Sequence, residues 1–185
     1  MAKHIIAICG YKRSGKDTVA NFIQSNYNYK HFKIAHCLKH VCKYLFDFTD
    51  DDMESDTKDI VNEKWGVTPR KVLQFIGTEL MQYRLQELMP GIGRDFWIRK
   101  CIQQIESTDD NIVISDLRFI HEYEALKRMY GDRLCVVKIL KTIEKKDDHE
   151  SETEWERIHA DYAVQNDSEL EQLYMNVNIF MKFFR

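Results

Sequence analysis

The sequence is poor in proline and glycine, with two prolines and seven glycines among 185 residues. It contains no internal repeat and no low-complexity linker, so nothing marks a domain boundary, and this length suits one domain with a sizeable core. No apolar run is long enough to span a bilayer, and no signal peptide precedes the first predicted strand. The net charge of -3 gives no general case for binding nucleic acid or a membrane.

Cysteine is present without any Cys-x-x-Cys pair. The count is odd, and the five positions are Cys9, Cys37, Cys42, Cys101 and Cys135. This pattern predicts free thiols in a reducing, cytoplasmic compartment and argues against a zinc site.

The stretch around which the chain is organised lies near the N-terminus. An apolar run at 4–9, too short for a helix, is followed by a loop with two glycines and a lysine, and then by an amphipathic segment. This order predicts a strand, a phosphate-binding loop (P-loop) and a helix. The residues predicted to bind nucleotide here are Gly10, Lys12, Arg13, Ser14, Gly15, Lys16, Asp17 and Thr18.

The residue types at these positions match the needs of a phosphate group. Gly10 allows a sharp turn off the strand, and Gly15 allows backbone N–H groups to approach phosphate oxygens. Lys16 reaches the β- and γ-phosphates as a mobile charge, and the helix N-terminus adds to the attraction. Asp17 stands where Ser or Thr usually holds Mg²⁺. A carboxylate can bind this ion directly or through water, so Asp17 is the candidate metal ligand.

The middle of the chain predicts two helices with polar residues on one edge. Thr68 is a good N-cap and Pro69 a good first helical residue, and Gly77 is expected to interrupt this helix. A second helix is predicted over 94–105. The polar and aromatic side chains that suit a monophosphate and a base are Arg70, Gln74, Thr78, Arg84 and Trp97. The alternative is a pair of ordinary amphipathic helices with charged outer faces.

A third predicted site element follows the apolar strand at 111–114. Asp116 and Arg118 come at its carboxyl end, which is the ligand-binding edge of an open parallel sheet. Asp116 is placed to act on Mg²⁺ through water or to accept from the substrate, and Arg118 to bridge the transferring phosphoryl group. In the alternative interpretation, Asp116 caps the next helix.

The last third contains a predicted strand at 134–140 and then a charged segment at 141–157. A charged segment at the end of a strand, next to the phosphate site, suits a lid that closes and excludes water. The candidate lid residues are Lys141, Lys145, Lys146 and Glu152. A solvated helix and loop is the alternative. A fifth strand is predicted at 161–164, and residues 166–168 are expected to cap a final helix over 169–183.

The alternation of strands and helices, with the P-loop first, predicts an α/β fold with a five-stranded parallel sheet flanked by helices in three layers. Nucleotide is expected at the carboxyl ends of the strands.

Several separated stretches together resemble the deoxynucleoside monophosphate kinases of phages and large DNA viruses, within the P-loop superfamily of nucleoside monophosphate kinases. The matching stretches are 12–18, 35–39, 68–70, 73–74, 77–79, 96–97, 116–119 with Glu122, 151–152 and 166–167. They are in order and span nearly the whole chain.

The resemblance implies ATP- and Mg²⁺-dependent phosphoryl transfer to a deoxynucleoside 5′-monophosphate. It places ATP on the P-loop with its adenine near Asn166, and it makes Lys16, Asp116 and Arg118 the catalytic residues. The acceptor would be bound in a helical region at about 36–106 by Lys39, Arg70, Gln74, Thr78, Arg84 and Trp97. The implied partners are small nucleotides rather than nucleic acid or a membrane, and a homodimer is compatible with the sequence.

Two other functions remain open at this point. An animal-type phosphomevalonate kinase looks similar in its Lys-x-Ser-Gly-Lys-Asp loop, its Ser-Asp-x-Arg strand end and its late Ser-Glu, although Gln74, Thr78 and Trp97 favour a nucleobase. A nucleotide-binding switch module without turnover is the second. The chain lacks the Asn-Lys-x-Asp guanine element and the Asp-x-x-Gly sequence of a switch loop.

Overall fold

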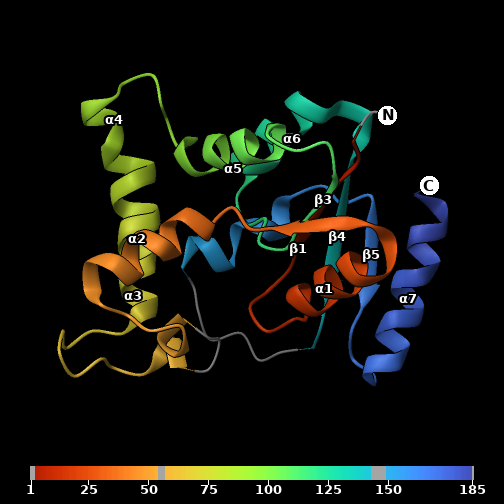
Figure 1. The fold of residues 1–185 in the computed structure, drawn as a ribbon, viewed down its shortest axis with the longest axis horizontal. Coiled ribbons are helices and arrows are strands. Elements are labelled where there is room, and N and C mark those ends of the chain that lie inside the picture. Colours follow the sequence, from red (N-terminus) through yellow and green to blue (C-terminus); the bar gives the residue numbers. More distant parts are fainter. Residues whose placement is uncertain (1–2, 54–56, 143–148, 185) are drawn as a thin grey trace. The chain divides into compact units, whose positions relative to one another are not determined.

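The centre of the computed structural model is a five-stranded parallel sheet with the strand order β2-β3-β1-β4-β5 (Figure 1). The structure describes residues 3–53, 57–142 and 149–184. The strands are β1 (Ile5–Cys9), β2 (Tyr29–Phe32), β3 (Asn111–Ile114), β4 (Leu134–Leu140) and β5 (Tyr162–Gln165). The predicted α/β fold with a five-stranded parallel sheet is confirmed.

The central strand β1 is buried along its whole length, which explains its unbroken apolar sequence. It pairs with β3 on one side and β4 on the other, so that Ile5 lies beside both Ile112 and Leu134. Because all five strands run in the same direction, their carboxyl ends share one edge of the sheet.

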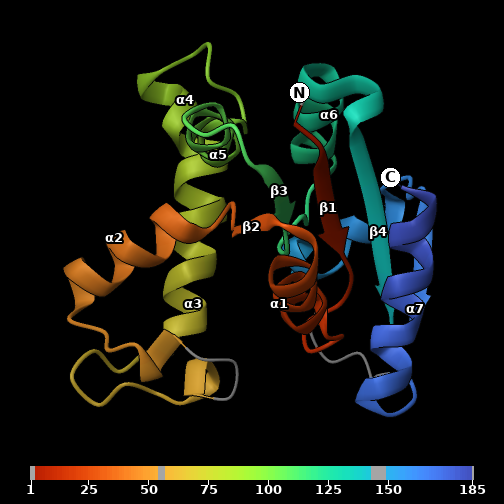
Figure 2. The ribbon, with the colours of Figure 1, turned by 45° about the vertical axis from the view of Figure 1, so that its right-hand side comes forward.

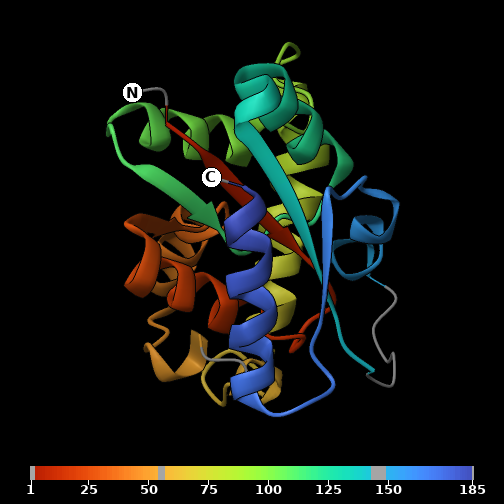
Figure 3. The ribbon, with the colours of Figure 1, turned by 90° about the vertical axis from the view of Figure 1, so that its right-hand side faces the viewer.

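Helices α1 (Lys16–Tyr27) and α7 (Leu170–Phe183) cover one face of this sheet. Val19 and Ile23 of α1 and Val177 of α7 enter the same apolar core as strands β1, β3, β4 and β5. Figure 3 shows α7 running along the strands. Helix α6 (Ile120–Tyr130) packs on β4. No helix in the described part of the chain has the length and hydrophobicity to cross a membrane.

The chain divides into two compact units. The first contains the sheet and comprises the chain up to Lys33 and from Cys101 onward; the second is Ile34–Lys100. The second unit is helical, with α2 (His36–Phe46), η1 (Asp51–Met53), η2 (Thr57–Asp59), α3 (Pro69–Gln74), η3 (Phe75–Arg84), α4 (Leu85–Leu88) and the start of α5 (Phe96–Glu106).

The long helix of the second unit begins as predicted but does not break at Gly77. Thr68 caps α3, because its side chain accepts from the Lys71 backbone N–H at 3.2 Å, and Pro69 is the first helical residue. The chain then continues as the π-helix η3 (Figure 2). A Cβ on Gly77 would lie 2.5 Å from Leu38 Cδ2, so this glycine serves close packing against α2. The predicted interruption is therefore wrong.

The predicted cap of the final helix is also wrong. Helix α7 begins at Leu170, and its N-cap residue Glu169 makes no side-chain cap bond. Asp167 instead accepts from the Thr142 backbone N–H at 2.6 Å, and the Asn166 amide donates to the Ser14 carbonyl at 2.8 Å. These polar side chains connect the loop after β5 to the end of β4 and to the P-loop, so they are not available to the helix.

The described part of the charged segment is more buried than a solvated loop. It forms the 3-10 turns η5 (Glu150–Glu152) and η6 (Glu154–Arg157), in which Ser151, Glu152 and Trp155 are buried. Residues 143–148 lie outside the described part of the chain, and with them the predicted lid residues Lys145 and Lys146.

The start of α6 is capped by Glu122. Its Oε2 accepts from the backbone N–H groups of Arg118 at 2.9 Å and Phe119 at 3.0 Å. Burial raises the pKa of Glu122 to about 8, outweighing the two N–H donors that lower it. This carboxyl group thus fixes the backbone from which the Arg118 side chain extends.

Gly10→Ala is expected to destabilise the protein. Gly10 has φ of 148°, and a Cβ there would lie 2.6 Å from the Ile139 carbonyl oxygen, a backbone atom that cannot rotate away. We expect a loss of about 2 kcal/mol and a fall in Tm of roughly 4–8 °C. Gly91→Ala is the matched control, because its Cβ would meet nothing within 4 Å. Equal Tm values for the two variants in thermal denaturation would contradict the packing argument.

Glu122→Ala is expected to cost on the order of 2 kcal/mol, because it leaves two backbone N–H groups without their acceptor. Glu122→Gln should retain most of the stability, since the amide oxygen still accepts both bonds and the native group is largely neutral at pH 7 with a pKa of about 8. Urea denaturation at pH 7 measures both. A glutamine variant as unstable as the alanine variant would show that the charge of Glu122 is what stabilises α6.

Candidate functional site

The P-loop connects β1 to α1 at the carboxyl edge of the sheet. Arg13 and Gly15 have φ of 62° and 98°, which turns the loop back on itself. A Cβ on Gly15 would lie 2.4 Å from Nδ2 of Asn166. This same nitrogen donates a hydrogen bond to the Ser14 carbonyl. Asn166 is therefore in contact with the loop, as a residue of the donor site must be. Its place near adenine stays a prediction.

Lys16 is buried inside the loop. Its Nζ donates to the carbonyl oxygens of Gly10 at 2.9 Å and Tyr11 at 2.7 Å. Burial, followed by the positive charge of Arg118, lowers the pKa of Lys16 to about 8. Among the described residues, nothing accepts from or donates to the buried hydroxyl of Ser14. The loop therefore contains a buried cation and an unsatisfied hydroxyl, which suit an anion with several oxygens.

Arg118 lies beside this loop and is held by Glu152. Its Nη1 donates to the Glu152 carboxylate and, at 3.3 Å, to the Ser151 carbonyl. The other carboxylate oxygen of Glu152 accepts from the Lys12 backbone N–H at 3.1 Å. Glu152, predicted as a lid residue, is thus buried between Arg118 and the P-loop. Closure of the segment stays a prediction.

Asp116 belongs to the same charged cluster. Its negative charge acts on the pKa values of Lys16, Arg118 and Glu122, so its carboxylate lies within electrostatic reach of all three. The cap of α6 comes from Glu122, and the catalytic role of Asp116 stays a prediction.

Asp17 has partners that the sequence analysis did not assign. Its Oδ1 accepts from Ser115 Oγ at 2.6 Å and pairs with Lys33 Nζ at 2.8 Å. Burial alone would raise the pKa of Asp17, but the bonds from Lys33 and Ser115 outweigh it and lower the pKa to about 2. Asp17 is thus a carboxylate at any physiological pH. Thr18, the next residue, is half-buried.

The metal candidate is therefore a single carboxylate. In the described part of the chain, no three His, Cys, Asp or Glu side chains are grouped to hold a metal ion. A hard cation at Asp17 would take its remaining ligands from phosphate oxygens and water, which is the usual way in which Mg²⁺ binds with nucleotides.

The residues predicted to bind the acceptor all lie in the second unit. Arg70 forms a two-point ion pair with Asp59, Nε to Oδ1 at 2.5 Å and Nη2 to Oδ2 at 3.2 Å. Gln74 and Thr78 follow Arg70 at helical spacing, and Thr78 is buried. Lys39 is a half-buried residue of α2.

Arg84 and Trp97 differ from expectation in detail. Arg84 stands six residues beyond Thr78, which is not a same-face spacing, and it is exposed and pairs with Glu87 at 3.3 Å. Arg84 therefore does not share the helix edge on which Arg70, Gln74 and Thr78 were predicted to lie. Trp97 is buried, and its indole N–H donates to the Gly77 carbonyl at 2.9 Å, which joins α5 to η3.

The sequence analysis missed Asp59, Lys33, His31 and Gln82. Gln82 is buried and accepts from Arg94 Nε at 3.0 Å. The positions of Lys33 and His31 at the end of a short strand were the only sequence signal for these two residues, since their partners are distant in the chain.

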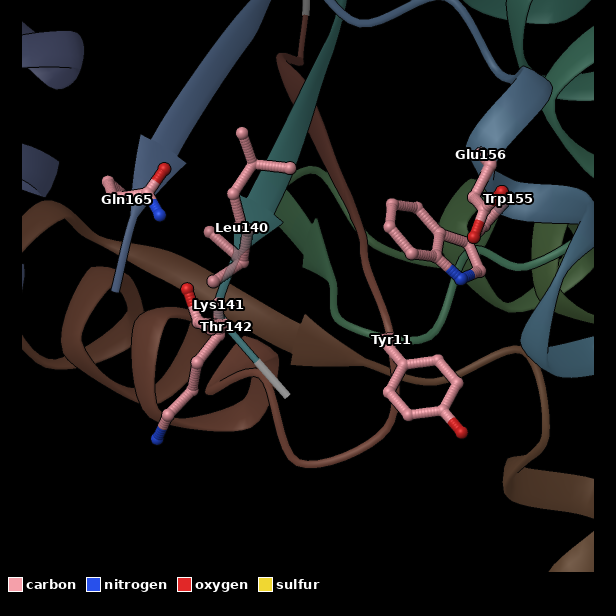
Figure 4. A pocket seen from close by; sticks show the side chains of 8 residues that line it. Tyr11, Leu140, Lys141, Thr142, Trp155, Glu156 and Gln165 are labelled. Carbon is pink, nitrogen blue, oxygen red and sulfur yellow. The ribbon is translucent and has the colours of Figure 1, made fainter. Parts of the chain in front are cut away.

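A cavity of about 330 Å³ opens at the carboxyl ends of β4 and β5 (Figure 4). Tyr11 of the P-loop and Trp155 of η6 contribute rings to it, and Leu140, Thr142 and Gln165 contribute strand-end side chains. Lys141, the described lysine among the predicted lid residues, also lines it. The volume is at the lower end of the range for small-molecule sites.

Comparison with solved structures identifies the fold. The chain superposes on a Thermus thermophilus protein with a TM-score of 0.52 and 15% identity, covering 100% of both chains. It superposes on the dephospho-CoA kinase of Campylobacter jejuni with a TM-score of 0.52 and 13% identity, covering 97% of this chain and 96% of the other.

Comparison of sequences identifies the family. A protein of Acanthamoeba polyphaga mimivirus that is assigned to the deoxynucleotide monophosphate kinases is 30% identical, over 94% of this chain and 93% of its own. The deoxynucleotide monophosphate kinase of Enterobacteria phage T4 is 22% identical, over 96% of this chain and 98% of its own. The family model for deoxynucleotide monophosphate kinase matches residues 4–66 and 47–177. With its P-loop, its Asp116 and Arg118 at the end of β3 and these matches along nearly its whole length, the chain belongs to the deoxynucleotide monophosphate kinase family.

Proposed function

We propose that this protein transfers the γ-phosphoryl group of ATP to a deoxynucleoside 5′-monophosphate, giving ADP and a deoxynucleoside diphosphate, with Mg²⁺ as the metal. The observation that carries the proposal is the buried Lys16, which faces the carbonyls of its own loop next to Arg118 in a chain of this family. Nothing in the relatives favours the phosphomevalonate kinase alternative.

In this mechanism the protein positions charge and has little covalent chemistry to perform. Lys16 exchanges its two carbonyl acceptors for phosphate oxygens of the donor. Arg118, held by Glu152 through Nη1, presents its remaining N–H donors to the transferring group, where negative charge must be stabilised. The acceptor phosphate is already an anion, so no strong general base is required.

The side chains present fit Mg²⁺. Asp17 is ionised, with a pKa of about 2, and a carboxylate oxygen is the ligand type that this ion prefers. When bound, Mg²⁺ neutralises charge on the phosphates of the nucleotide. Asp17 would hold it, and Asp116 would act on it through water.

We assign acceptor binding to the second unit. Asp59 fixes the guanidinium of Arg70 through two contacts, so that its remaining donors keep one orientation toward an incoming phosphate. Gln74 and Thr78, with the edge of Trp97, supply polar and aromatic contacts for a base. Lys39 adds positive charge.

We place the adenine of ATP near Asn166, at the cavity beside Tyr11 and Trp155. The cavity lies at the edge of the sheet where the P-loop also lies, and it offers two aromatic rings and the polar end of Gln165. Lys141 of the predicted lid lines the same cavity, and we propose that it contacts the phosphates.

The test is ADP production in a coupled assay with ATP and Mg²⁺. The acceptors compared are the four natural deoxynucleoside monophosphates, their ribose counterparts and mevalonate 5-phosphate, with Lys16→Met as the inactive control. Turnover of at least one deoxynucleotide, lost in the control, supports the proposal. Turnover of mevalonate 5-phosphate alone would assign the other kinase, and ATP binding without any turnover would indicate a switch module.

Arg70→Ala is expected to raise KM for the monophosphate by about tenfold or more while KM for ATP changes little, because in this proposal Arg70 binds the acceptor and not ATP. Arg128→Ala, which removes an exposed arginine of α6, is the control and should leave both constants unchanged. Steady-state kinetics with each substrate varied in turn measure the effect. Equal increases in both KM values would place Arg70 outside the acceptor site.

Nucleotide binding at pH 8.5 is expected to take up a proton. Lys16 has a lowered pKa of about 8 in the free protein, so it is mostly neutral at pH 8.5, and the phosphates of ATP raise its pKa again. Above pH 8, affinity should therefore fall as pH rises. Isothermal titration calorimetry in two buffers of different ionisation enthalpy counts the protons. We expect uptake of at most about three-quarters of a proton at pH 8.5, little at pH 6.5, and none at pH 8.5 in Lys16→Met.

A further inference from the structure

A chain of side chains leads from helix α1 through strand β2 to the carboxylate of Asp17. His31 Nδ1 lies 3.0 Å from the side-chain oxygen Oδ1 of Asn21, and His31 Nε2 lies 2.7 Å from Ser115 Oγ. Ser115 Oγ in turn donates to Asp17 Oδ1 at 2.6 Å. These four residues come from α1, β2 and the end of β3, and neither the family match nor the phosphate chemistry assigns a role to His31 or Ser115.

The direction of the hydrogen bonds follows from the number of available protons. Ser115 has one hydroxyl proton, and it goes to Asp17 because an ionised carboxylate can only accept. His31 must then donate from Nε2 to Ser115 Oγ. When the ring is neutral, Nδ1 carries no proton and must accept a hydrogen bond. The Asn21 amide nitrogen is the donor once this exposed amide is turned by 180°, which exchanges its oxygen and nitrogen. The hydrogen-bond network decides between these two orientations of an amide.

Ser115 is the rigid contact of Asp17. Ser115 is 1% exposed at the end of β3, whereas the Asp17 side chain is 59% exposed. Lys33 also contacts Oδ1, but it does so from the end of a long, flexible side chain, which fixes the orientation of the carboxylate less well than the buried Ser115 hydroxyl does. Both contacts fall on Oδ1, and no described residue donates to Oδ2. The carboxylate is thus fixed by one oxygen and open at the other.

We propose that His31 is a positioning residue which, through Ser115, fixes the Asp17 carboxylate by Oδ1, so that Oδ2 would be available to hold Mg²⁺. The inference rests on the proposed function in so far as Asp17 is the metal ligand. Hydrogen-bond partners behind a ligand commonly control metal affinity in this way, and their loss costs 10- to 100-fold.

The test measures metal binding directly. Mn²⁺ is titrated into the protein saturated with ADP and followed by electron paramagnetic resonance. The variants are His31→Ala, His31→Gln and, as an exposed control, His159→Ala. We expect a Kd for Mn²⁺ raised at least about tenfold in His31→Ala, unchanged in His159→Ala, and largely restored in His31→Gln, whose amide can donate to Ser115 from nearly the same place.

Other readouts separate positioning from packing. The affinity for ADP without metal should stay within about twofold in all three variants, because the chain ends on the metal ligand and not on the phosphates. If His31→Ala does not fold, Ser115→Ala removes the same bond from the other side, and the same rise in the Kd for Mn²⁺ is expected.

Two outcomes overturn the inference. An unchanged Kd for Mn²⁺ in His31→Ala or in Ser115→Ala, or a glutamine variant as impaired as the alanine variant, would show that the ring only packs. If the wild-type protein binds ADP but no Mn²⁺, the metal role of Asp17 fails together with the inference. The wild-type titration and the acceptor assay therefore show whether the inference alone or the proposed function is wrong.

Discussion

The carboxylate of Glu152 is the interaction on which the phosphate-binding edge depends. One oxygen accepts from Arg118, and the other accepts from the Lys12 backbone N–H, a contact between residues 140 positions apart. Glu152 is 1% exposed, and a buried carboxylate is tolerated only when it is paired and hydrogen-bonded. The P-loop, the end of β3 and the 3-10 turns must therefore fold together.

This arrangement brings two cations close together. Burial and the charge of Arg118 lower the pKa of Lys16 to about 8, while Glu152, Asp17 and Asp116 act in the opposite direction. Lys16 meanwhile satisfies its N–H donors on the loop carbonyls. The site therefore contains two cations that protein carbonyls and a carboxylate hold in place. A polyphosphate would replace the carbonyl partners of Lys16 and would meet an Arg118 side chain that Glu152 already orients.

Local patterns predicted the regular elements well and the roles of single residues less well. The strand, loop and helix around Lys16, the cap at Thr68 and the five parallel strands follow from spacing and turn chemistry. The predicted break at Gly77 was wrong, because this glycine makes room for the Leu38 side chain of another helix. The predicted cap by Asp167 was wrong for the same kind of reason, since the Asp167 carboxylate accepts a hydrogen bond from the Thr142 backbone N–H instead. In each case a partner distant in sequence replaced the local one.

The sequence by itself determined the family, the parallel sheet and the identity of the phosphate loop, because periodicity and glycine spacing act over a few neighbouring residues. Only the tertiary structure decided which charges meet. The pairs Arg118 with Glu152, Asp17 with Lys33, and Asn166 with the Ser14 carbonyl join segments that come together only in the fold. A charged or polar side chain selects its partner by distance and burial in the folded chain, and neither quantity can be read from its neighbours in sequence.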